Sequence, residues 1–101
     1  MIVLAMMFST QVYYTGTDFM ALCKADRSRC TSYIEGVLDG TNALLDALDK
    51  NELACIPDGT TGATLTNVTM QYFQNNTDKW QYTAASSIMV ALIRAYPCSK
   101  S

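Results

Sequence analysis

The feature that most constrains this chain is its set of four cysteines, which occur without a single histidine in 101 residues. Histidine supplies the general base in most hydrolytic sites and a ligand in most zinc sites. The absence of histidine excludes catalytic sites of the Cys/His and Ser/His types and metal sites with histidine ligands. An even cysteine count in a short chain is typical of an oxidising compartment, where disulfides supplement a small core. We therefore predict structural disulfides, no metal, no cofactor and no enzymatic activity.

The four cysteines permit three full pairings. In one continuous helix Cys23 and Cys30 would be separated by about 10.5 Å of rise, whereas bridged α-carbons lie about 4.4 to 6.8 Å apart. A Cys23–Cys30 bond therefore requires a helix break near residues 26–28. A Cys55–Cys98 bond would tie two helix ends together and contribute about 4 kcal/mol on the chain-entropy model. Zinc ligation and a reactive thiol are weaker alternatives, because no cysteines have a two-residue spacing and no adjacent base is available.

Composition narrows the class of protein further. Half of the residues are apolar, which is enough for one modest core, and seven basic against nine acidic side chains give a net charge of −2. No basic stripe of the kind that binds nucleic acid is present. No run reaches the roughly 20 apolar residues of a membrane-spanning helix, so we expect no membrane insertion of the mature chain. We interpret residues 1–15 as a leader remnant or an N-terminal apolar arm or helix, and residues 16–101 as one helical domain.

Apolar spacing along the domain is helical rather than alternating. It predicts an all-α fold, a compact bundle of four to five short helices tied by two disulfides. We expect four helices in this domain. The first runs from an N-cap at Thr17 to about Asp26, and the second is a long helix that is capped by Ser28 or Thr31 and includes Leu48. The third runs from an N-cap at Thr64 to Asn75, and the fourth starts at Thr77 and ends before Pro97.

Two glycines, Gly36 and Gly40, lie one turn apart inside the long helix. Each costs about 1 kcal/mol relative to alanine in a helix interior, so a compensating contact is expected. Together they leave a groove in the helix surface. Either another helix of the same chain or the same helix of a second copy could pack there.

The order of motifs resembles one known family. The segments YIEGVLD at 33–39, CIP at 55–57 and ALIRAYPC at 91–98 follow one another as in the Rap/Tai family of bacterial type VI secretion immunity proteins. The resemblance covers about residues 16–98. It implies a small helical periplasmic protein, often a homodimer, that binds and inhibits a peptidoglycan-cleaving amidase effector and is not itself an enzyme.

Most of the matching residues have an architectural role under this resemblance. Cys55 and Cys98 act as a clamp, Gly36 permits close approach, and Pro57 and Pro97 end helices. Family members commonly have His-Pro at the end of the third helix, where this chain has Asn-Asn at 75–76. The matching motifs do not include the surface that contacts the effector.

A preorganised surface on a rigid scaffold is what an inhibitor needs, because rigidity reduces the entropy lost on binding. The first candidate for insertion into an enzyme cleft is the polar loop after Cys55, and the second is the outer face of the third helix; a plain connector is the alternative for the loop. The loop residues are Asp58, Gly59, Thr60, Thr61 and Gly62, and the helix residues are Asn67, Gln71 and Gln74.

A rival interpretation is a secreted, non-enzymatic helical domain that carries a small apolar ligand. Its cavity would be lined by methionines, namely Met6, Met7, Met20, Met70 and Met89. Methionines at such positions more often fill gaps in a core. A large interior pocket would favour the carrier, whereas a filled core with a protruding loop would favour the inhibitor.

Overall fold

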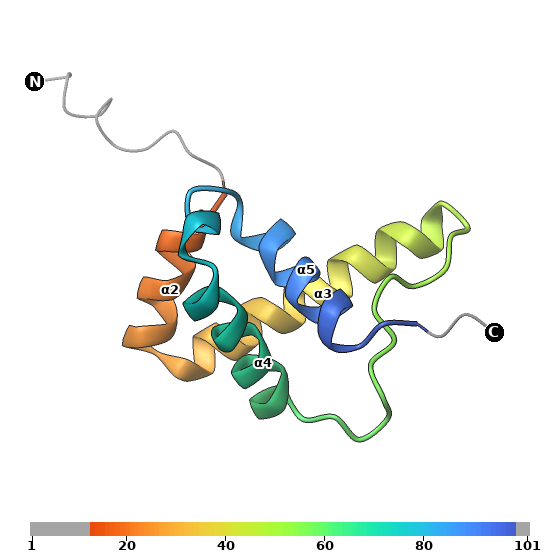
Figure 1. The fold of residues 1–101 in the computed structure, drawn as a ribbon. Coiled ribbons are helices and arrows are strands. Elements are labelled where there is room, and N and C mark those ends of the chain that lie inside the picture. Colours follow the sequence, from red (N-terminus) through yellow and green to blue (C-terminus); the bar gives the residue numbers. More distant parts are fainter. Residues whose placement is uncertain (1–12, 99–101) are drawn as a thin grey trace, which may run out of the picture.

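The computed structural model describes residues 13–98, and this part of the chain is all-α (Figure 1). It contains four α-helices and one short 3-10 helix: α2 (Gly16–Ala25), α3 (Arg27–Ala47), α4 (Gly62–Asn75), η1 (Thr77–Lys79) and α5 (Ala84–Ala95). Two disulfides join Cys23 to Cys30 and Cys55 to Cys98. The predicted fold class is confirmed. The predicted arm at 1–15, with Met6 and Met7, lies mostly outside the described residues.

The first helix begins earlier than predicted because Thr15, and not Thr17, is its N-cap. The Thr15 hydroxyl accepts from the backbone N–H of Asp18, and the Asp18 carboxylate accepts from the backbone N–H of Thr15 at 3.0 Å. This reciprocal capping box satisfies two backbone donors. Thr17 therefore lies inside α2, where its hydroxyl donates to the Trp80 carbonyl.

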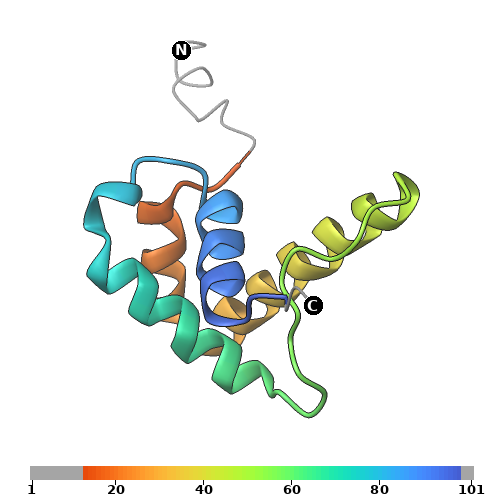
Figure 2. The ribbon, with the colours of Figure 1, turned by 45° about the vertical axis from the view of Figure 1, so that its right-hand side comes forward.

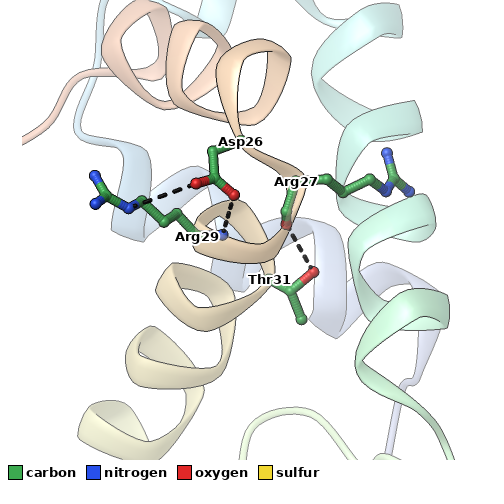
Figure 3. A network of polar contacts seen from close by, with 4 residues as sticks. All are labelled: Asp26, Arg27, Arg29 and Thr31. Carbon is green, nitrogen blue, oxygen red and sulfur yellow. Dashed lines mark hydrogen bonds and ion pairs between the residues drawn. The ribbon is translucent and has the colours of Figure 1, made fainter.

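A single residue, Asp26, both ends α2 and starts α3 (Figure 3). Its extended backbone (φ −153°, ψ 100°) leaves the helix, its N–H donates to the Leu22 carbonyl, and its carboxylate accepts from the N–H of Arg29. The predicted caps at Ser28 and Thr31 are wrong. The break lies where a Cys23–Cys30 bond required one, and it brings those α-carbons to 4.6 Å.

The last two helix starts also differ from the prediction. Thr61 caps α4 by accepting from the N–H of Thr64, and Thr77 begins only the 3-10 helix η1. An isolated β-bridge between Thr15 and Thr83 then turns the chain, so α5 starts at Ala84. The ends at Asn76 and before Pro97 are confirmed.

The core forms where α2, α4 and α5 pack around the first half of α3 (Figure 1). Its centre consists of fully buried side chains, namely Phe19, Ile34, Phe73, Ile88 and Leu92. The rings of Phe19 and Phe73 lie 5.1 Å apart in a tilted arrangement, which is a favourable geometry for aromatic pairs. The core therefore draws on all four α-helices.

The second half of α3 extends beyond this core (Figure 2). The two buried residues of α3, Cys30 and Ile34, both belong to its first half. Further along, Leu44 and Leu48 are 59% and 57% exposed. The segment that follows returns along the overhang to the Cys55–Cys98 disulfide. This end of the helix therefore carries apolar side chains that the rest of residues 13–98 does not cover.

Two neighbouring buried threonines on α4 allow a matched stability test. The Thr66 hydroxyl lies 2.6 Å from that of Thr31 and donates to the Gly62 carbonyl, whereas the equally buried Thr69 hydroxyl has no hydrogen-bond partner. A buried polar group without a partner retains its desolvation cost. We expect Thr69→Val to raise the free energy of unfolding by about 1 kcal/mol and Thr66→Val to lower it by about 1 kcal/mol. Urea unfolding of both variants checks this, and a loss of stability in Thr69→Val would contradict it.

Candidate functional site

A tight turn at residues 57–61 forms the tip of the loop before α4. The N–H and hydroxyl of Thr60 both donate to the Pro57 carbonyl, at 3.2 and 2.7 Å. Gly59 adopts a φ of +88°, which glycine tolerates and other residues rarely adopt. Asp58 and Gly59 are exposed. The turn is thus closed by its own hydrogen bonds and presents a carboxylate at its tip.

The chain is anchored on both sides of this turn. On the N-terminal side, the Cys55–Cys98 disulfide is reinforced by a hydrogen bond from the Cys55 N–H to the Tyr96 carbonyl at 2.8 Å. On the C-terminal side, Gly62 packs so closely on α3 that an added Cβ would lie 2.7 Å from the Glu35 carboxylate and 2.8 Å from the Thr31 methyl group. The tip is therefore held on a base fixed to α3 and to the end of α5.

The predicted loop residues divide into three groups. Asp58 and Gly59 lie at the tip, while the side chains of Thr60 and Thr61 bond within the turn and the first turn of α4. Gly62 is the first residue of α4 and lies against α3, so it is not at the tip. The exposed part of the candidate loop is smaller than the sequence indicated.

The three predicted residues on α4 are exposed and, at spacings of four and three residues, follow one stripe of the helix. Asn67 accepts a hydrogen bond from Arg27, and Gln74 lines a groove beside α2. Gln71 instead lines a shallow hollow between α4 and α5, where the Arg94 guanidinium lies 5.7 Å from the centre of the Tyr72 ring. Helix α4 therefore separates two surfaces.

The glycine pair of α3 faces open space. A Cβ added to Gly36 or Gly40 would meet no atom within 4 Å, so no described segment of the chain packs against them. The expected intramolecular contact is absent from the described structure. Leu44 and Leu48 follow Gly40 by four and eight residues, and both are exposed. The open surface of α3 therefore continues as an apolar ridge.

Sequence reasoning missed this ridge. The apolar residues of this helix recur at three- and four-residue intervals from Ile34 to Leu48, and that spacing predicts a long helix without showing which of its side chains are covered. The exposed side chain of Leu53 adds to the apolar surface beyond the helix end. No local signal distinguishes an apolar stripe that a chain buries from one that extends past its neighbours.

Chemistry on the described surface is limited. All four cysteines are in disulfides, and residues 13–98 contain no cluster of three or more potential metal ligands. Burial, followed by the charges of Tyr14 and Asp18, raises the pKa of Tyr33, whose ring stacks on Tyr14 at 5.4 Å. In the folded protein the Tyr33 phenol therefore keeps its proton to a higher pH than in the unfolded chain. The contribution of this neutral phenol to the free energy of unfolding is complete below pH 10 and is lost as the pH rises through the raised pKa.

The three methionines that the structure describes, Met20, Met70 and Met89, do not line a common interior cavity. Met89 is buried in the core, whereas Met20 and Met70 line the surface groove between α2 and α4. No helix among the described residues has the length and apolarity needed to cross a membrane.

The described structure is a disulfide-braced helical domain with a buried apolar core and an anchored, exposed turn. The family model described as Rap1a immunity proteins matches residues 15–98. The chain therefore belongs to the Rap1a family of immunity proteins, as the motif resemblance indicated, and its partner is an effector protein. Proteins of this kind generally act by binding rather than by catalysis. No curated protein and no solved structure matches the chain.

Proposed function

We propose that this protein resides in the periplasm and inhibits a peptidoglycan amidase delivered by type VI secretion, by placing the 57–61 turn in the active-site groove of the amidase. The observation that supports this most directly is the anchoring of the turn. A disulfide on one side and the close packing of Gly62 on the other hold its exposed tip in place. A preorganised tip loses little conformational entropy on binding, which favours tight association.

Protection of cells tests this proposal. The chain is co-expressed with the peptidoglycan amidase proposed as its partner, with and without export of the immunity protein. We expect survival only when the protein is exported, because its two disulfides form in an oxidising compartment and the substrate of the amidase lies there. Equal protection by a cytoplasmic form would contradict the periplasmic site.

A charge reversal tests the turn itself. Asp58→Arg adds bulk and inverts the charge at the tip, and we expect it to weaken amidase binding at least a hundredfold, as loss of a central contact does. Asp78→Arg is the matched control, because Asp78 is also exposed, with 72% of its side chain accessible, and lies in η1 rather than in the turn. Calorimetric titration of both variants with the amidase measures the difference. Loss of binding on changing Gln71 or Gln74, with Asp58→Arg unaffected, would move the site to α4.

We further propose that two copies of the chain associate through the ridge of α3. One face of α3 carries a glycine or a leucine at every fourth residue, namely Gly36, Gly40, Leu44 and Leu48. The glycines permit the close approach of the same helix of a second copy, and each copy would then cover the leucines of the other. Leu44→Glu combined with Leu48→Glu should yield monomers in sedimentation analysis. Tyr82→Glu, which alters a side chain that is 53% exposed at the other end of the molecule, should leave the dimer intact.

A further inference from the structure

A second surface, separate from the 57–61 turn, combines apolar and cationic side chains. It is a groove of about 590 Å³ between α2 and α4, on the side of α4 away from α5. Ligand sites for small molecules typically enclose about 300 to 1,000 Å³ and combine apolar walls with a few polar groups. The groove has that size and that combination.

The floor of the groove is apolar. Met20 from α2 and Met70 from α4 face it together with Trp80. The indole N–H of Trp80 donates to the Phe73 carbonyl at 2.9 Å, so the rest of its indole ring is an apolar surface. Methionine side chains adapt to ligands of varied shape because they are unbranched and flexible.

One end of the groove is cationic. Lys24 lies in the last turn of α2, and Arg27 begins α3. Figure 3 shows the Arg27 side chain directed toward α4 and away from Asp26, where it donates to the Asn67 side-chain oxygen. Trp80 lies at the opposite end of the groove. The N–H of Thr17, which is in the first turn of α2, donates to the Trp80 carbonyl at 3.0 Å, whereas Lys24 is in the last turn of that helix. The cations and the indole ring therefore lie at opposite ends.

The two cations have no carboxylate partner in the described chain. The nearest acid in sequence, Asp26, pairs instead with Arg29 at 3.6 Å and caps α3. No carboxylate lines the groove. In a chain with a net charge of −2, two adjacent cations without an acidic partner form a local site for an anion.

We infer that the α2–α4 groove binds a single-chain amphiphilic carboxylate, with the carboxylate at Lys24 and Arg27 and the alkyl chain along Met20, Met70 and Trp80. The separation of a charged end from an apolar floor selects this class over neutral apolar molecules and over small inorganic anions. This groove shares no residue with the turn or the α3 ridge. Its ligand binding can therefore be tested separately from the binding of an effector to the turn.

The single tryptophan of the chain makes the test direct. Trp80 emission is followed while the full protein is titrated at low ionic strength with decanoate below its micellar concentration. Decyl glucoside and decyltrimethylammonium provide the same alkyl chain with a neutral and a cationic head. We expect decanoate to bind about tenfold more tightly than the glucoside, because two exposed ion contacts add that much, and the cation to bind weakest. The methyl resonances of Met20 and Met70 should shift with the same affinity.

Two variants separate the head from the tail. Lys24→Gln with Arg27→Gln should weaken decanoate binding about tenfold and leave the glucoside unchanged, whereas Met70→Gln should weaken both. Lys50→Gln with Arg94→Gln makes the same change in net charge away from the groove and should have no effect. Equal affinity for the three head groups, equal binding of acetate and decanoate, or no response of Trp80 and the methyl groups would overturn the inference.

Discussion

Replacing Cys55 and Cys98 together by serine should lower the free energy of unfolding by about 4 kcal/mol. The bond closes a loop with a sequence separation of 43 residues, and the chain-entropy model assigns a loop of that length about this value. The expected loss is large because small domains are stable by only about 5 to 15 kcal/mol. Urea unfolding of the oxidised wild type and the double variant measures it, and an unchanged midpoint would contradict this value.

The same bond should be the first to open in reductant. Cys55 is exposed and Cys98 is partly exposed, whereas Cys23 and Cys30 are 6% and 0% exposed. Mass spectrometry after brief exposure to a thiol should show alkylation at Cys55 and Cys98 first. Hydrogen exchange should then rise in residues 51–61 before it rises in α2. Prior reduction of the buried pair would contradict the assigned burial.

Truncating Phe73 to alanine should lower the free energy of unfolding by about 4 kcal/mol, because it combines lost apolar burial with a cavity at the centre of the core. The ring is fully buried against Phe19 and lies close to Gly16, where an added Cβ would be 3.1 Å from it. The site is rigid, since backbone segments from α2 and from residue 80 meet there, so little collapse is expected. Calorimetric melting of the disulfide-intact protein checks the value.

Tyr82→Ala is the matched control for this truncation. It also removes an aromatic ring, but one that is 53% exposed, and its loss should cost less than about 1 kcal/mol. If both variants lost the same stability, Phe73 could not be the central core residue that its burial indicates.

The turn, the α3 ridge and the α2–α4 groove involve separate residues, so each proposal can be tested without disturbing the others. Asp58 lies at the tip of the turn, Leu44 and Leu48 on the overhang of α3, and Lys24 and Arg27 at the α2–α3 corner. A variant of one surface serves as a folding control for the remaining two.

Local signals in the sequence were sufficient for the fold class. The helical spacing of apolar residues, the turn-forming residues around Pro57, and Pro97 after the last helix act within a few residues of the chain, and the structure agrees with all three. The predicted helix starts were less accurate, because several threonines and aspartates nearby are comparable caps. Thr61 rather than Thr64 caps α4, and the helix begins at Gly62, which packs closely on α3.

By itself, the sequence determined that this protein is a small all-α domain held by sulfur and without histidine chemistry, since residue types and short spacings carry that information. Only the tertiary structure decided which surfaces remain available for binding. Leu44 and Leu48 are apolar like the buried Ile34, yet they are exposed because the other helices cover only the first half of α3. Likewise, Lys24, Met70 and Trp80 are distant in sequence and line one groove because α2 and α4 pack on a common neighbour. Burial depends on where distant segments end in space, and no local pattern records that.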